Sequence, residues 1–261
     1  MLTNSEIINH LLKIFLQIIF ILTFSSLLFA DENPLPIVVI DPGHGGKDPG
    51  ALSKFGIREK NLVLSLSKKL AVVLRKKMKA QVFLTRHNDR FITLANRNRI
   101  ANQKQCDLFL SIHANAAKSP KVDGLEIYYL NKATDKASQK LAHRENEGSP
   151  KPEKELEAIV SDLIQTASTE ESSELAGRVQ KSFVRHLQKK YEIQDIHVKT
   201  ALFYVLVGAK CPSLLVETGF ITNKQEAKRL KSKDYQQALV SAIASGIEDY
   251  WKDLEKPKGD L

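Results

Sequence analysis

Hydrophobic and polar positions alternate between strand-like and helix-like patterns along the chain. Short apolar runs predict buried strands at residues 37–40, 81–85, 108–112, 203–207 and 213–216. Apolar residues spaced by three and four predict helices at 61–77, 94–105, 173–191 and 235–251. The stricter alternation at 124–130 predicts an edge strand. This order favours an α/β fold, a single domain with a mostly parallel central sheet flanked by helices.

The first thirty residues have a different pattern. Residues 14–29 are almost wholly apolar, Lys13 precedes them, and Leu28-Phe29-Ala30 comes before polar residues. This predicts a secretory signal peptide over residues 1–30. The stretch also approaches the length of a membrane span, so an uncleaved anchor is the alternative. Either way, we expect residues 31–261 to be exported.

Composition and charge narrow the class of protein. The chain has 261 residues, 43% of them hydrophobic and 26% charged, which excludes a multi-span membrane protein and a disordered chain. The net charge of +9 indicates an acidic partner, but export and the lack of a basic-aromatic stripe argue against nucleic acid. Cys106 and Cys211 could pair in an oxidising compartment, and the sequence does not decide whether they do.

Candidate chemistry gathers where the predicted strands end. His44 follows the first strand, His113 ends the third, and Glu217 ends the strand at 213–216; Glu59 begins the first long helix. The carboxyl ends of parallel strands share one edge of a sheet, so these side chains should converge. Two histidines and a glutamate match the ligand set of a catalytic zinc, which keeps one position open for water. A further carboxylate beside that water could act as general base.

Each of these residues also has an ordinary explanation when taken alone. A histidine after a strand is more often a loop or packing residue. Glu59 could simply stabilise the positive end of a helix dipole, and Glu217 could be a solvated strand end. The glycine-rich run at 43–47 lacks the spacing of a phosphate-binding loop. The metal hypothesis therefore depends on the joint placement of the four residues.

Other polar residues carry weaker predictions. Arg86, Asp89 and Arg97 fit a structural ion-pair cluster at least as well as a substrate site. Four further histidines have no partner at ligand spacing, and we expect them at the surface: His87, His143, His186 and His197.

Several motifs in order make the chain similar to a known family. Residues 39–51 read VIDPGHGGKDPGA, residues 107–116 read DLFLSIHANA, and residues 212–223 read PSLLVETGFITN. With Glu59-Lys60-Asn61, these resemble the zinc-dependent N-acetylmuramoyl-L-alanine amidases over roughly residues 36–250. The resemblance implies that His44, Glu59 and His113 hold Zn²⁺ and that Glu217 is the catalytic carboxylate.

The implied reaction is hydrolysis of the amide between N-acetylmuramic acid and L-alanine in peptidoglycan. Two other functions stay open on the residues alone: another exported zinc peptidase, or an inactive wall-binding regulator. The resemblance further implies a periplasmic monomer of the Gram-negative type that acts in daughter-cell separation. Only residues 31–36 separate the export segment from the first strand, so we expect no separate wall-targeting module there.

Residues 131–174 form a long segment between two predicted core elements. They carry ten acidic and six basic residues, a net charge of −4, which leaves +13 on the rest of the chain. Helices are predicted at 134–145 and 153–167, with a break between them; the apolar stripe of the second helix could simply pack on the core. Division-associated members of the family resemble this insert at residues 133–138 and 144–146. The resemblance implies that a helix of the insert covers the zinc site until an activator protein displaces it.

Overall fold

The computed structural model describes residues 13, 15, 17, 35–149 and 167–255 of the chain. It contains two units, Met1–Leu35 and Pro36–Leu261, and the fold described here is that of the second. The predicted signal peptide and the predicted helix at 153–167 fall almost entirely outside the described residues. Within the described part, none of the helices combines the length and the apolar character that crossing a membrane requires.

Six strands form one sheet in the order β2-β1-β3-β6-β4-β5. Their bounds are β1 Ile37–Pro42, β2 Gln81–Leu84, β3 Leu108–Asn115, β4 Leu125–Leu130, β5 Ile196–Ala201 and β6 Ser213–Phe220. Four of the strand pairs are parallel, and β4 with β6 is antiparallel. The mostly parallel sheet is therefore confirmed. The buried β-branched run of β1 pairs with the apolar run of β3, which brings their carboxyl ends together.

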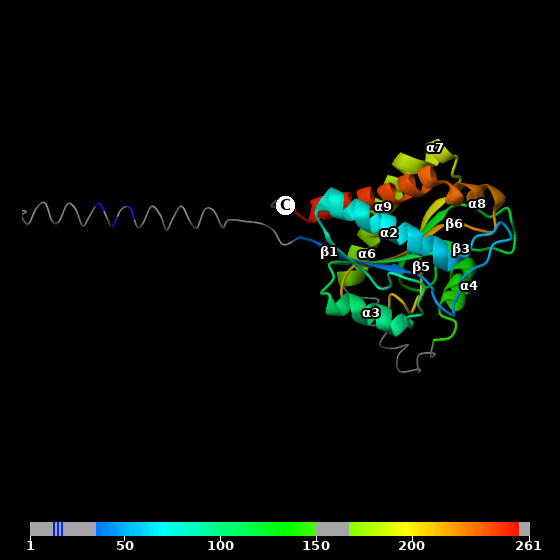
Figure 1. Ribbon diagram of the computed structural model, residues 1–261, viewed down its shortest axis with the longest axis horizontal. Coiled ribbons are helices and arrows are strands. Elements are labelled where there is room, and N and C mark those ends of the chain that lie inside the picture. The colour runs from blue at the N-terminus through cyan, green and yellow to red at the C-terminus, as the bar shows by residue number, and fades with distance from the viewer. Residues whose placement is uncertain (1–12, 14, 16, 18–34, 150–166, 256–261) are drawn as a thin grey trace, which may run out of the picture. The chain divides into compact units, whose positions relative to one another are not determined.

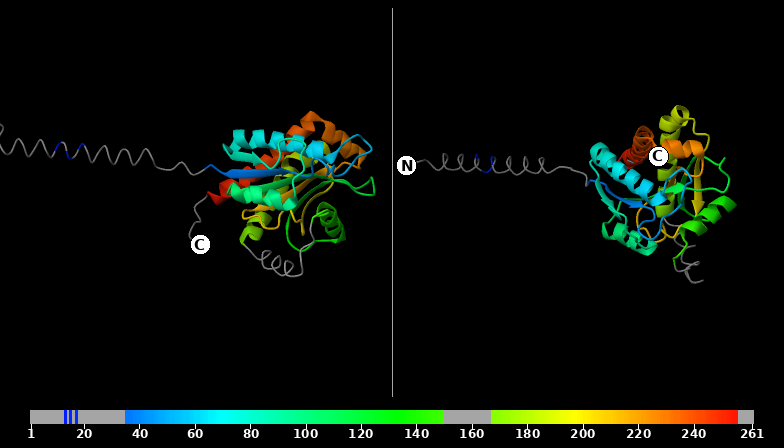
Figure 2. Two further views of the ribbon diagram at one scale, coloured as in Figure 1. Left: turned by 60° about the horizontal axis from the view of Figure 1, so that its bottom comes forward. Right: turned by 45° about the vertical axis from the view of Figure 1, so that its right-hand side comes forward.

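Helices cover both faces of the sheet (Figures 1 and 2). Their bounds are α2 Glu59–Met78, α3 Leu94–Gln103, α4 Lys136–Glu145, α6 Ala167–Phe183, α7 Lys189–Tyr191, α8 Lys224–Lys231 and α9 Lys233–Leu254, with a π-helical turn η1 at Val184–Gln188. The apolar stripes of α2, α6 and α9 bury one face of the sheet in a continuous core. On the other face, Leu141 and Ala142 of α4 share a smaller core with Tyr128 and Phe203.

Two sequence predictions about strands are wrong. The run 203–207 is a turn, because Phe203, Val205 and Leu206 are buried in the smaller core rather than paired in the sheet. The strand in this region is β5, and it forms the edge of the sheet. The strand predicted at the edge, β4, lies between β6 and β5 and is buried. The helix predicted at 173–191 also begins earlier, as α6, and continues through η1 and α7.

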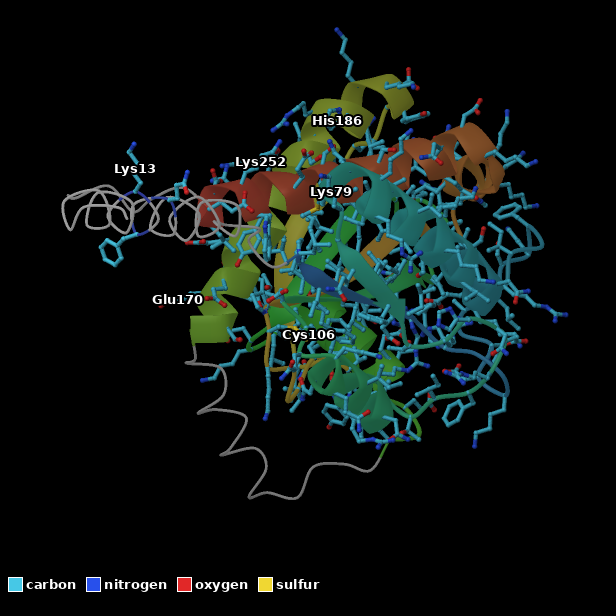
Figure 3. The ribbon with its side chains drawn as sticks, turned by 60° about the vertical axis from the view of Figure 1, so that its left-hand side comes forward. Lys13, Lys79, Cys106, Glu170, His186 and Lys252 are labelled. Atoms are coloured by element: carbon cyan, nitrogen blue, oxygen red, sulfur yellow. A yellow bond between two sulfur atoms is a disulfide. The ribbon has the colours of Figure 1, made fainter. Side chains whose placement is uncertain are left out.

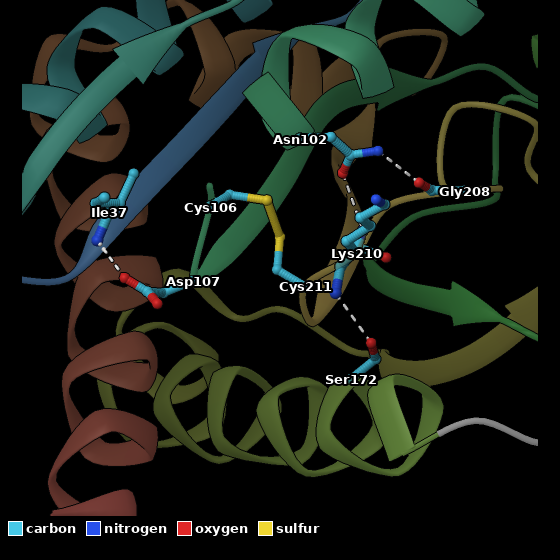
Figure 4. Close-up of a disulfide and its surroundings, with 9 residues drawn as sticks. Ile37, Asn102, Cys106, Asp107, Ser172, Gly208, Lys210 and Cys211 are labelled. Carbon is cyan, nitrogen blue, oxygen red and sulfur yellow. Dashed lines mark hydrogen bonds between the residues drawn. A yellow bond between two sulfur atoms is a disulfide. The ribbon is translucent and has the colours of Figure 1, made fainter. Parts of the chain in front are cut away.

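Cys106 and Cys211 form a disulfide, with their Cα atoms 6.0 Å apart (Figure 4). The bond joins the turn before β3 to the loop before β6, two strands that neighbour each other in the sheet. Asn102 of α3 supports the same loop, since its side chain donates to Gly208 O at 2.8 Å and accepts from Lys210 N at 3.0 Å. These contacts fix the entry of both strands that carry candidate site residues.

Candidate metal centre

The three predicted ligands meet at the carboxyl edge of the sheet. His44 lies in the loop after β1, Glu59 is the first residue of α2, and His113 lies near the end of β3. Glu59 Oε1 is 3.0 Å from His44 Nε2 and 3.1 Å from His113 Nδ1. The Glu59 side chain is 1% exposed, so it does not serve merely as a solvated charge at a helix end.

Two glycines allow the ligand loop to pack this closely. A Cβ atom on Gly43 would lie 2.4 Å from His113 Cε1. One on Gly50 would lie 2.7 Å from Glu59 Oε2, and Gly50 has a φ of +63° that favours glycine. His44 itself has a φ of +57°. The glycine-rich run therefore brings ligands together.

A fourth residue, a carboxylate that the sequence did not identify as a ligand, completes the cluster. Glu145, the last residue of α4, places Oε2 at 3.2 Å from both His44 Nε2 and His113 Nδ1. Its side chain is only 5% exposed. A glutamate at the C-terminal end of a helix is unfavourable for the helix dipole, and this was the signal available in the sequence. Its contact with the two histidines offsets that cost.

The four ligand atoms are close enough together to hold one metal ion. They all lie within 4.8 Å of one another, and the four ligand-to-ligand contacts are 3.0–3.2 Å. Ligand atoms about 2.1 Å from a tetrahedral zinc lie roughly 3.4 Å apart. Neither His44 Nε2 nor Glu145 Oε2 has a hydrogen-bond partner within the described part of the chain, although both are buried. These atoms are oriented as ligands, and the residues present could hold a metal ion.

Polar contacts outside the cluster orient the ligands. Asp48 Oδ2 lies 2.8 Å from His44 Nδ1, which leaves Nε2 of that ring free to face the site. Glu59 accepts backbone hydrogen bonds from Ala51 N at 2.8 Å and from Ala114 N at 3.0 Å. The ligand geometry is therefore set by the fold before any ion binds.

The electrostatics of the cluster favour a cation. Burial alone would lower the pKa of His44, but the charge of Glu59 and the hydrogen bond to Asp48 raise it to about 12. Burial is likewise outweighed at His113, where Glu145 and Glu59 raise the pKa to about 9. The two histidines in turn lower the pKa of Glu59 to about 2, against the effect of its burial. In the metal-free protein, protons therefore supply the positive charge that a metal ion would bring.

The predicted catalytic carboxylate lies directly beside the cluster. Glu217 of β6 is fully buried and pairs in register with His113 of β3. Neither of its oxygens has a hydrogen-bond partner among the described residues. Burial, with the negative charges of Glu145 and Glu59, raises its pKa well above the ordinary value, although His113 opposes this. Glu217 is thus a proton-binding carboxylate at the site, not a solvated strand end.

Two buried arginines hold the backbone beneath the ligands. Arg86 donates to Gly43 O at 2.6 Å and to Lys60 O at 2.9 Å, so it joins the His44 loop to the first turn of α2. Arg97 donates to His44 O at 2.9 Å and to Asp41 Oδ1 at 2.8 Å.

Asp41 receives further hydrogen bonds from Thr85 and Ser111. Burial would raise the pKa of Asp41, but Arg97 and these hydrogen bonds keep it below the ordinary value. Arg97 forms a buried ion pair, whereas Arg86 holds the backbone through hydrogen bonds to carbonyl oxygens. Asp89 makes separate contacts: it accepts a hydrogen bond from Gly46 N and forms an ion pair with Lys60 at 2.7 Å.

Four further histidines are at the surface, as predicted. His87, His143, His186 and His197 are all exposed. His186, on η1, is labelled in Figure 3.

Polar contacts on either side of Glu145 anchor the end of α4. Arg144 donates to Ala116 O at 2.8 Å and to Asn115 Oδ1 at 3.1 Å. Asn146 donates to Leu202 O at 2.7 Å and accepts from Tyr204 N at 2.8 Å. The helix therefore spans the site from the loop after β3 to the loop after β5. A cavity of about 540 Å³ remains open beside the site, between α4 and the loop before α3.

Fold and site together define an α/β protein whose sheet edge brings together a histidine–glutamate cluster that could hold a metal ion. Residues 38–249 match the family model Amidase_3, described as N-acetylmuramoyl-L-alanine amidase, and the chain belongs to this family. The expected activity, hydrolysis of the N-acetylmuramic acid to L-alanine amide in peptidoglycan, is thereby confirmed. The match favours it over a different exported peptidase or an inactive regulator.

Relatives and solved structures agree with the family. The chain is 36% identical over 231 residues to the amidase AmiA of Escherichia coli K12, covering 84% of this chain and 78% of AmiA. It is 36% identical to AmiC of Neisseria meningitidis, where it spans about half of the relative (52%) and 82% of this chain is covered. The structure of AmiC2 from Nostoc punctiforme superimposes with a TM-score of 0.64 at 32% identity, covering 83% of this chain and 97% of that one.

Proposed function

We propose that the chain is a zinc-dependent amidase held closed by its own insert. His44, Glu59 and His113 hold the ion, and residues 31–261 form one catalytic domain that contains the insert 131–174. A bound zinc ion supplies a water of lowered pKa and polarises the scissile carbonyl. The convergence of three ligand atoms from the loop after β1, from α2 and from β3 supports this ligand set.

Glu217 is proposed as the general base and acid. It accepts a proton from the attacking water as the carbon–oxygen bond forms. It returns the proton to the nitrogen of L-alanine as the carbon–nitrogen bond breaks. Its burial without hydrogen-bond partners and its raised pKa support this role, because both strengthen the affinity of this carboxylate for a proton.

Substitutions at the site test these assignments. Glu217→Gln should keep one zinc per chain and lose two to four orders of magnitude in the rate of amide cleavage. His44→Ala should lose both zinc and activity. The measurements are metal content by mass spectrometry and muropeptide products, with a free L-alanine amino terminus as the diagnostic product. Near-normal cleavage by a purified Glu217→Gln enzyme would exclude the role given to this residue.

Glu145 is proposed as the autoinhibitory ligand. With it, the ion has four protein ligands, which is typical of structural zinc sites; without it, one position opens for water. Its distance of 3.2 Å from both histidines is the observation that carries this proposal. The position of α4 across the site explains why the amidase would stay inactive until the helix is displaced.

A partner protein is proposed to displace α4. One structural relative with 26% identity, the CwlD amidase of Clostridioides difficile, was solved in complex with the GerS lipoprotein. For this chain we propose an activator of the division machinery that engages the insert. We also propose export of the chain to the periplasm through a cleaved signal peptide at 1–30. Its substrate there is peptidoglycan, and its role is the separation of daughter cells.

The test of autoinhibition compares two glutamates. Glu145→Ala should raise the basal rate on purified sacculi at least tenfold, because it opens the fourth position. Glu147→Ala is the matched control: Glu147 is exposed, lies two residues away and has no contact with the ligands, so its removal should leave the rate unchanged. Equal rates for wild type and Glu145→Ala, with zinc bound in both, would rule out autoinhibition by this residue.

A further inference from the structure

The loop after β3 presents two hydrogen-bond acceptors next to the metal centre. They are Asn115 Oδ1 and Ala116 O, two and three residues beyond His113. In the closed structure both accept from the guanidinium of Arg144, at 3.1 Å and 2.8 Å. The same guanidinium donates through Nε to Glu145 Oε1 at 3.0 Å. One planar group thus links the carboxylate in the metal site to the two acceptors.

A buried network fixes the orientation of Asn115. Its Nδ2 donates to Glu126 Oε2 at 2.9 Å. Glu126 also accepts from Tyr128 OH at 3.0 Å and pairs with Lys199 at 2.7 Å. Since the amide nitrogen faces the carboxylate, the amide oxygen must face the site. Ala116 N holds that oxygen at 2.8 Å, and the Asn115 residue is 5% exposed.

Removal of α4 leaves these acceptors without the donors that Arg144 supplies. Asn115 Oδ1 keeps its hydrogen bond from Ala116 N and can accept one more, and Ala116 is half-buried, so both acceptors can receive N–H groups of the substrate in the open enzyme. One guanidinium spans the distance between the Glu145 carboxylate and the two acceptors. This distance corresponds to one or two peptide units of an extended chain. The peptide groups that follow the scissile amide lie at this distance.

We propose that Asn115 Oδ1 and Ala116 O form a subsite for the N–H groups of the stem peptide, on the leaving-group side of the scissile amide. In the closed enzyme the pair Arg144-Glu145 occupies both positions at once: the carboxylate lies at the metal site and the guanidinium lies in the peptide subsite. This inference rests on the proposed function, because it assumes that α4 leaves the site before substrate binds. Asn115 would then help to recognise the length and identity of the stem peptide, in addition to anchoring α4.

The test separates substrate binding from helix anchoring. The double variant Arg144→Ala/Glu145→Ala removes the occupant of the subsite, and Asn115→Ala is then introduced into that background. Two substrates are compared: N-acetylmuramoyl-L-alanine, which has no peptide N–H beyond the scissile amide, and the corresponding N-acetylmuramoyl tripeptide. Both contain the N–H of the sugar acetamide group.

The expected result is selective for the longer substrate. Asn115→Ala should lower kcat/KM on the tripeptide substrate about 3- to 10-fold, through KM, and leave the short substrate unchanged. Zinc affinity should not change. Gln237→Ala in the same background is the control, since this exposed amide on α9 bonds Ser241 and should affect neither substrate.

Two other outcomes would contradict the subsite. No effect on either substrate would show that Asn115 only anchors α4. An equal loss on both would indicate recognition of the sugar N–H or a structural role. If Asn115→Ala fails to fold, Glu126→Gln releases the orientation of Asn115 and should give the same selectivity in weaker form. Absence of cleavage of both substrates by the open double variant would instead contradict the proposed function itself.

Discussion

The metal centre has two sides that are held in different ways. On the side of β1, α2 and β3, the ligand loops rest on Arg86, Arg97 and Asp41, which are at most 1% exposed. On the side of α4, Glu145 depends on Arg144, whose side chain is 38% exposed, and on contacts to two surface loops. Buried charge pairs are strongly destabilising to break, whereas exposed ones contribute little. The comparison indicates a rigid ligand set combined with a releasable fourth ligand.

The largest expected effect is on the rigid side. Arg97→Ala leaves Asp41 buried without its ion-pair partner, which should lower the free energy of unfolding by about 3–5 kcal/mol. Arg144→Ala should lower it by less than about 1 kcal/mol. Urea denaturation of the metal-free proteins measures both, with Arg97→Lys as the conservative control that keeps the charge. Similar losses for the two alanine variants would remove the distinction between the sides.

The next effect concerns the protons on the rigid ligands. The pKa values of about 12 for His44 and about 9 for His113 mean that both rings are protonated in the metal-free protein between pH 6 and 8. A metal ion must displace both protons, so the apparent zinc affinity should rise about 100-fold per pH unit over this range.

Calorimetry in buffers of different ionisation enthalpy measures this directly. We expect release of about two protons per zinc at pH 7. Release of less than one proton would mean that the histidines are already neutral, and that the carboxylates do not bias the metal-free site as described.

The smallest effect is on the releasable side. Arg144→Ala removes two hydrogen bonds that hold α4 on the loop after β3 and a third one to Glu145, but leaves Glu145 in place. It should raise the basal amidase rate about 3- to 10-fold, which is less than the effect of Glu145→Ala. The reason is that the closed state loses the free energy of one to two hydrogen bonds relative to the open state. The check is dye release from labelled sacculi by fully zinc-loaded enzyme. A lowered rate would show that Arg144 assists catalysis rather than closure.

The local sequence pattern was sufficient to predict the rigid side of the site. The β-branched run of β1 and the apolar run of β3 specify adjacent parallel strands, and their carboxyl ends bring His44 and His113 together. The first position of α2 then adds Glu59. The motif resemblance covers the same residues, so fold and predicted ligand set agree.

The releasable side depended on contacts that no local pattern encodes. Glu145 comes next to the two histidines because Arg144 and Asn146 dock α4 on loops distant in sequence. Phe203 resembled a strand residue because burial in a small core and burial in a sheet give the same apolar run. The pairing of Cys106 with Cys211 likewise required the two strand entries to be placed side by side.

The central claim is that Glu145 closes the metal site of the resting enzyme. A crystal structure of the zinc-loaded full-length mature chain, with the metal located by anomalous scattering, tests it most directly. The account predicts zinc bound by His44, Glu59, His113 and Glu145, with the Glu145 oxygen about 2.0–2.2 Å from the ion. A zinc ion with the same three ligands, water in the fourth position and Glu145 pointing away would contradict it.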